Sequence, residues 1–185
     1  MTKPSGKYLV LPYIDQKLDF WEKVIDLGGE RIREVYFPIT DGRISTGRPK
    51  QPGKHLKRFL ESGILPVSVL INPIVLARPA ECYTNLVINT LEYYSQNYRL
   101  TGATLTNLTL GQRVREAFPN LKLAASTLMD ISSEQQISVV MKTFDIVVPP
   151  ARVMRDIRSL RSMRRIFPGT IRLMVNEACL PSCLF

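Results

Sequence analysis

The chain has 185 residues, 45% hydrophobic and 22% charged, which is typical of one globular domain over residues 1–185. No apolar stretch approaches the roughly 20 residues of a membrane span, and the first apolar run is too short for a signal peptide. These features and the odd count of 3 cysteines exclude a disulfide scaffold and predict a cytoplasmic protein with no membrane partner. The net charge of +9 leaves open either a plain solubilising surface or an anionic partner such as RNA.

Short runs with strand character alternate along the chain with stretches whose apolar residues recur at helical spacing. We predict strands over 8–14, 34–39, 66–72, 102–107, 121–126, 145–148 and 170–175. We predict helices over about 18–28, 54–61, 80–98, 110–118, 134–142 and 151–167. Glycines follow the first helix, and a serine at 132 or 133 can cap the fifth.

This alternation with short connections predicts βαβ units and a parallel sheet. A repeat of about 25 residues is typical of a (β/α)8 barrel of about 250 residues. We therefore expect an α/β, TIM-barrel-like domain of about seven units, truncated before its final unit. A doubly wound sheet is the structural alternative, but residues 14–17 after the first strand do not form a glycine-rich phosphate loop.

Polar side chains follow nearly every predicted strand, where a barrel collects its functional groups. Amides and hydroxyls there can orient a polar ligand, and Glu177 can act as an acid or a base. The alternative is that these residues only form turns after strands. The catalytic candidates are Asn72, Asn107, Asn176 and Glu177, and the substrate-binding candidates at these ends are Ser126 and Thr127, with Asp15 at the same mouth.

Two arginine-rich segments suggest anion binding. The loop 40–50 carries Arg43 and Arg48, which can hold an anionic group, although a plain solvated loop would look the same. The helix 151–167 carries arginines at three-residue spacing, which can track a nucleic-acid backbone or simply form the solvated side of an outer helix. These arginines are Arg152, Arg155, Arg158, Arg161, Arg164 and Arg165.

The cysteines and the single histidine indicate only part of a metal or cofactor site. Cys179 and Cys183 have C-x3-C spacing and can share an iron–sulfur cluster or a zinc ion, but both sites usually need four ligands. We therefore expect no cofactor bound to this chain alone. We expect Cys82 to be a structural thiol, at the end of its helix away from the strand ends. His55 is expected at the surface, so no histidine-assisted nucleophile is indicated.

Two segments resemble the peptidase U32 (collagenase-like protease) superfamily. The first is 125–131, Ala-Ser-Thr-Leu-Met-Asp-Ile. The second runs from Asp145 through Arg155-Asp156 and Leu160, an "R-D-x-x-x-L" helix, to Cys183. The plan of strands and helices resembles the family over most of the chain, and the motifs do so over roughly the last 65 residues. The family's "A-P-A-G" opening turn is replaced here by residues 11–14, Leu-Pro-Tyr-Ile.

The resemblance implies a TIM-barrel-like domain. It also implies cysteine- and iron–sulfur-dependent, hydroxylation-type modification of a polar or nucleic-acid-related substrate, with Cys179 and Cys183 as partial ligands of a cluster completed in a longer form. The alternatives are a U32-type peptidase or hydrolase and a non-catalytic scaffold that binds RNA or another anion. Because an unfinished barrel exposes strand edges, we also expect a homodimer or a partner that completes the barrel.

Overall fold

The computed structural model describes residues 7–39, 41–46, 53–73 and 80–175. Its core is one parallel sheet in which the strands follow each other in sequence order from β1 to β7. The strands are β1 Leu9–Pro12, β2 Ile32–Pro38, β3 Val67–Ile71, β4 Leu100–Leu105, β5 Lys122–Ala125, β6 Ile146–Val147 and β7 Thr170–Ile171. Each predicted strand is present, mostly shorter than expected.

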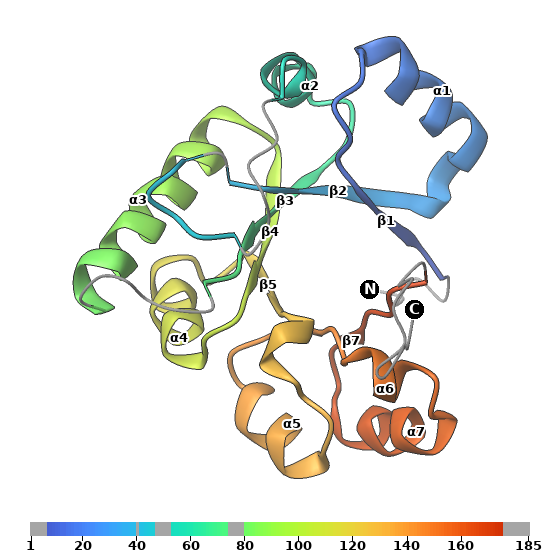
Figure 1. Cartoon of the computed structure of the whole chain (residues 1–185), viewed down its shortest axis with the longest axis vertical. Helices are drawn as coiled ribbons and strands as arrows, with labels where there is room; N and C mark the ends of the chain where they lie inside the picture. Colours follow the sequence, from blue (N-terminus) through green and yellow to red (C-terminus); the bar gives the residue numbers. More distant parts are fainter. Residues whose placement is uncertain (1–6, 40, 47–52, 74–79, 176–185) are drawn as a thin grey trace, which may run out of the picture.

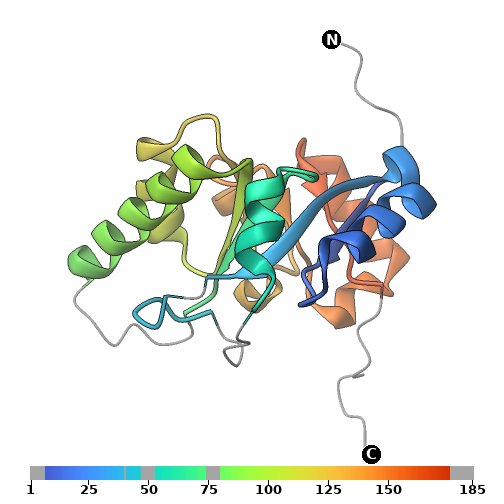
Figure 2. The same ribbon diagram turned by 90° about the horizontal axis from the view of Figure 1, so that it is seen from above.

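The sheet curls, and the helices lie on its outer side (Figure 1). Figure 2 shows α3 and α1 at opposite sides of the molecule, with the strands between them. A doubly wound sheet reverses its strand order, so the sequential order excludes that alternative. The helices are α1 Leu18–Gly28, α2 Leu56–Ser62, α3 Ala80–Asn97, α4 Leu108–Ala117, α5 Glu134–Val140, α6 Ala151–Met154 and α7 Ile157–Ile166, with short 3-10 turns η1 Gly29–Arg31 and η2 Thr127–Met129.

The fold is thus a TIM-barrel-like half-barrel, as predicted. Within the described residues, β1 and β7 are the two edges of the sheet and do not pair with each other. No helix of this described part is both long and apolar enough to cross a membrane.

Side chains of β3 show how the sheet divides the interior. Val67, Val69 and Ile71 are almost fully buried in the apolar core between sheet and helices. Ser68 is buried on the opposite, inner side of the curl, where it lines a pocket. Because strand side chains alternate between faces, Asn72, which follows β3, belongs to the inner side with Ser68.

Local signals set several helix boundaries as the sequence indicated. Gly29 ends α1 with a positive φ of 53°, a conformation that glycine adopts readily. Ser133 caps α5, where its hydroxyl accepts from the Gln136 N–H and the Gln136 side chain accepts from the Ser133 N–H.

Two expectations were wrong. The helix predicted over 151–167 is divided into α6 and α7, because the Asp156 carboxylate accepts from the Arg158 N–H and begins a new helix. Cys82 is exposed rather than structural. It also lies on the first turn of α3, which follows the carboxyl end of β3 and is therefore on the same side as the strand ends.

Candidate functional site

The carboxyl ends of three neighbouring strands bring polar residues into one row on the inner side of the sheet. The register pairs Ile71 of β3 with Leu105 of β4, and Leu105 with Ala125 of β5. The next residue on each strand is polar, so Asn72, Thr106 and Ser126 lie side by side. Two of the predicted candidates are therefore brought together, with Thr106 between them.

Asn72 has an unsatisfied hydrogen-bonding atom. Its side chain is buried, with 8% of the residue exposed. Its Oδ1 atom has no hydrogen-bond partner among the described residues. A buried carbonyl oxygen without a donor costs about 1–3 kcal/mol, so such an atom needs a reason to be there. A ligand that donates an N–H or O–H is one such reason.

Other predicted site residues use their polar atoms within the protein. Asn107 begins α4 and accepts from the Leu110 N–H at 2.9 Å. Ser126 accepts from the Leu128 N–H at 3.3 Å, and the Thr127 hydroxyl donates to the Pro149 carbonyl at 3.2 Å. Next to Asn72, the Thr106 hydroxyl donates to the Pro73 carbonyl at 3.0 Å.

Asp15, after β1, joins the mouth to the start of α2. Its carboxylate accepts from the Lys54 and His55 N–H groups and from the Tyr13 hydroxyl. The bond from the His55 N–H, followed by the bonds from Tyr13 and Lys54, lowers the pKa of Asp15 despite partial burial. Burial and the adjacent carboxylate raise the pKa of Tyr13, which therefore stays protonated and keeps donating. Asp15 thus positions a helix.

Of the remaining candidate residues for substrate binding, catalysis or cofactor binding, Arg43 is the one that lies in the described part of the chain. The Arg43 guanidinium forms an ion pair with Asp41 at 2.6 Å. This ion pair raises the pKa of Arg43. Outside the described residues lie Arg48, Asn176, Glu177, Cys179 and Cys183.

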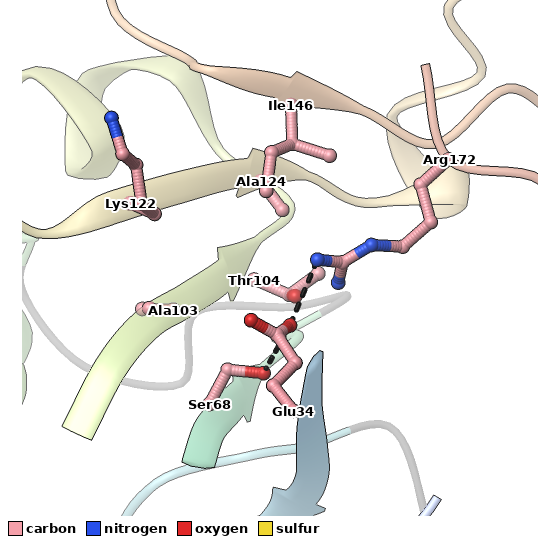
Figure 3. Close-up of a pocket in the computed structure, with 9 residues that line it drawn as sticks. Glu34, Ser68, Ala103, Thr104, Lys122, Ala124, Ile146 and Arg172 are labelled. Atoms are coloured by element: carbon pink, nitrogen blue, oxygen red, sulfur yellow. Dashed lines mark hydrogen bonds and ion pairs between the residues drawn. The ribbon is translucent and has the colours of Figure 1, made fainter. Parts of the chain in front are cut away.

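The structure also shows a polar cluster that the sequence did not predict (Figure 3). Glu34 of β2 accepts from Arg172 at 2.8 Å and from the Ser68 hydroxyl at 3.0 Å. The Glu34 and Arg172 side chains are only 13% and 16% exposed. They span a narrow pocket on the inner side of the sheet, which Thr104 also lines.

Strand tilt explains why residues so far apart in register meet. The ladder links Pro38 of β2, through the intervening strands, to Thr170 of β7. Glu34 lies four residues before Pro38 and Arg172 two residues after Thr170, so the pair is offset by six residues over five strand steps. In a closed eight-stranded barrel, a shear of about 8 gives an offset of about one residue per strand. The offset between Glu34 and Arg172 is close to this value. The half-barrel therefore curls with the tilt of a full barrel.

No group of three or more histidine, cysteine, aspartate or glutamate side chains that could hold a metal ion is present in the described part of the chain. Its one described cysteine, Cys82, is on the outside of α3. The described residues therefore provide no fit for an iron–sulfur cluster, and any ligands must come from elsewhere.

The fold resembles that of a known protein. The structure of the U32 peptidase Mk0906 superposes with a TM-score of 0.66 and 13% sequence identity, covering 94% of this chain and 70% of that one. No protein-family model matches the sequence, and no curated protein matches it. The chain therefore has a divergent U32-like fold, in agreement with the resemblance seen in its motifs.

Proposed function

We propose that this chain forms the barrel part of a U32-like enzyme that binds a polar substrate at the carboxyl ends of its strands. The observation that carries the proposal is the buried Asn72 Oδ1 atom, which has no donor among the described residues. It lies on the inner side of the sheet, at the end where barrels of this kind place their chemistry. Asn72 would accept a hydrogen bond from the substrate and orient it.

The substrate class follows from this acceptor. Asn72 needs an N–H or O–H donor, which excludes a purely apolar ligand and suits both a nucleobase edge and a peptide amide. Thr106 and Ser126 complete the polar row beside it. A small number of fixed polar groups that converge at one place is typical of sites that orient a ligand.

For the reaction, we propose cysteine- and iron–sulfur-dependent modification of the hydroxylation type, with Glu177 and Asn176 at the reacting group. Support comes from the sequence: Glu177 lies two residues before Cys179, and Cys183 follows at C-x3-C spacing. The cluster would be completed in a longer form. A U32-type hydrolase is the second candidate, but the chain has a single histidine, His55, and no hydrogen bond among the described residues joins its imidazole to a nucleophilic side chain.

Two measurements test this proposal. Saturation-transfer NMR with uridine and with N-acetylglycinamide as probes should detect binding of at least one to the wild type, weakened at least tenfold by Asn72→Ala. Asn97→Ala, which removes an exposed amide at the end of α3, is the matched control and should leave binding unchanged. No binding by the wild type, or equal binding by Asn72→Ala, would contradict the site.

The chemistry is tested separately by iron and acid-labile sulfide content after anaerobic purification of this chain and of a longer natural form. We expect both elements in the longer form and their loss in Cys179→Ser/Cys183→Ser. Absence of iron from the longer form would contradict the cluster and favour the hydrolase.

A further inference from the structure

Helix α7 presents a row of arginines to solvent, away from the mouth. At 100° per residue, Arg158, Arg161 and Arg165 lie on the side of α7 opposite the fully buried Met163. All three are exposed. We call these three residues the arginine stripe. Helix α7 lies on the outer side of the curled sheet (Figure 1), so the stripe is part of the molecular surface.

Neighbouring carboxylates compensate the stripe only in part, because Asp156 interacts electrostatically with Arg158 but forms no ion pair with it. Among the described residues, none of its three guanidinium groups forms an ion pair with an aspartate or glutamate. The nearby acidic groups already have partners. Asp156 accepts from the Arg158 N–H and the Ser159 hydroxyl, and Glu134 of α5 accepts from the Ser162 hydroxyl.

By contrast, several arginines on other elements of the described part form ion pairs with carboxylates. Arg115 binds Asp145 at 2.5 Å, and Arg113 binds Glu116 at 3.1 Å. Arg152, just before α7, forms an ion pair with Asp130. What distinguishes the stripe is that three exposed arginines without an ion pair lie on one face of a single helix, and the net charge of +9 adds a favourable long-range field for anions.

From this arrangement we infer that the arginine stripe is a docking surface for the phosphate backbone of RNA, separate from the mouth. Spacings of three and four residues at 1.5 Å per residue place the arginines about 4.5 and 6 Å apart along the helix, close enough to engage successive phosphates. Guanidinium groups bind phosphate oxygens in bidentate geometry. No aromatic residue lies on α7, so binding would follow the backbone and not the base sequence.

An RNA backbone fits better than an acidic protein partner. Interfaces between proteins usually have an apolar centre, whereas the stripe carries only charged side chains, with Ile157 the one exposed apolar residue of the helix. A regular row of cations is matched by a regular row of phosphates.

Fluorescence anisotropy with a labelled 20-nucleotide poly-uridylate tests the inference. Counterion release of about 0.7 per phosphate corresponds to about fivefold per contact at 0.1 M salt, so Arg158→Gln/Arg161→Gln/Arg165→Gln should weaken binding on the order of 100-fold. The slope of log K against log salt should fall by about 2. The matched control is Lys23→Gln/Arg33→Gln/Arg58→Gln, which removes the same charge from exposed residues of α1, β2 and α2. It should change Kd less than threefold.

An equal loss in both triple variants would overturn the inference, because it would show only a net-charge effect. Tighter binding to poly-glutamate than to the RNA would overturn it in favour of an acidic protein partner, and undetectable RNA binding by the wild type would overturn it outright. Asn72→Ala should bind the RNA like the wild type, so failure of the mouth site and failure of this surface are distinguishable.

Discussion

Two levels of the inner side of the sheet differ in how their polar groups are satisfied. At the lower level, the Glu34 carboxylate is bound by both Arg172 and Ser68, and the cluster links β2 to the end of β7. The Arg172 Nε atom has no hydrogen-bond partner among the described residues, so the contrast concerns the acceptor oxygens. At the carboxyl end, Asn72 is buried more deeply than Glu34 and Arg172, and its Oδ1 has no partner among the described residues. The difference separates polar residues that hold the curl together from one that is left to meet a ligand.

The largest expected change in stability comes from breaking the ion pair between Glu34 and Arg172. Glu34→Ala leaves the Arg172 guanidinium buried without its carboxylate and should lower the free energy of unfolding by about 3 kcal/mol, since breaking a buried pair exposes an uncompensated charge. Urea denaturation measures this. Glu34→Ala/Arg172→Ala should recover part of the loss. If the double variant loses the full sum of both single effects, the pair does not act as a unit.

A second paired carboxylate should make stability fall in acid. Asp145 is partly buried, which by itself raises its pKa, but the Leu123 N–H and then the Arg115 guanidinium lower it overall. A lowered folded pKa means that its stabilisation is complete above the unfolded value of about 3.9 and is lost as pH falls through the folded value. We expect stability to decline below about pH 4.

Asp145→Asn separates this carboxylate from the others. It should be less stable at pH 7 by about 2 kcal/mol, because charge-assisted hydrogen bonds are lost, and should show a weaker decline below pH 4 in melting experiments. An unchanged acid profile in this variant would assign the decline to other groups.

A smaller loss of stability is expected for Ser68→Ala, which tests what the Ser68 hydroxyl contributes to the cluster around Glu34. It removes one donor to Glu34 but leaves the ion pair intact, so we expect a loss of about 1 kcal/mol in the free energy of unfolding. A neutral result in urea denaturation would mean that Arg172 alone satisfies Glu34.

The sequence predicted the order of elements well because periodicity and turn residues act locally, as at Gly29 and Ser133. It missed the break before α7, since the arginine-rich pattern continues across Asp156 and only the capping bond shows the interruption. It identified Asn72 but did not distinguish it from Asn107, because both follow strands and only tertiary burial shows which acceptor is already used. Glu34 and Arg172 were missed, since their contact depends on strand tilt over five steps.

Replacing Asn72 by a leucine of similar branching tests the central claim most directly. If the amide is kept for a ligand, Asn72→Leu removes an unsatisfied buried acceptor and should raise the free energy of unfolding by about 1 kcal/mol in urea denaturation. In the same experiment Asn107→Ala, which removes a helix cap, should lower it by about 1 kcal/mol. A loss of stability in Asn72→Leu comparable to that of Asn107→Ala would show that Asn72 supports the fold, and would contradict the account.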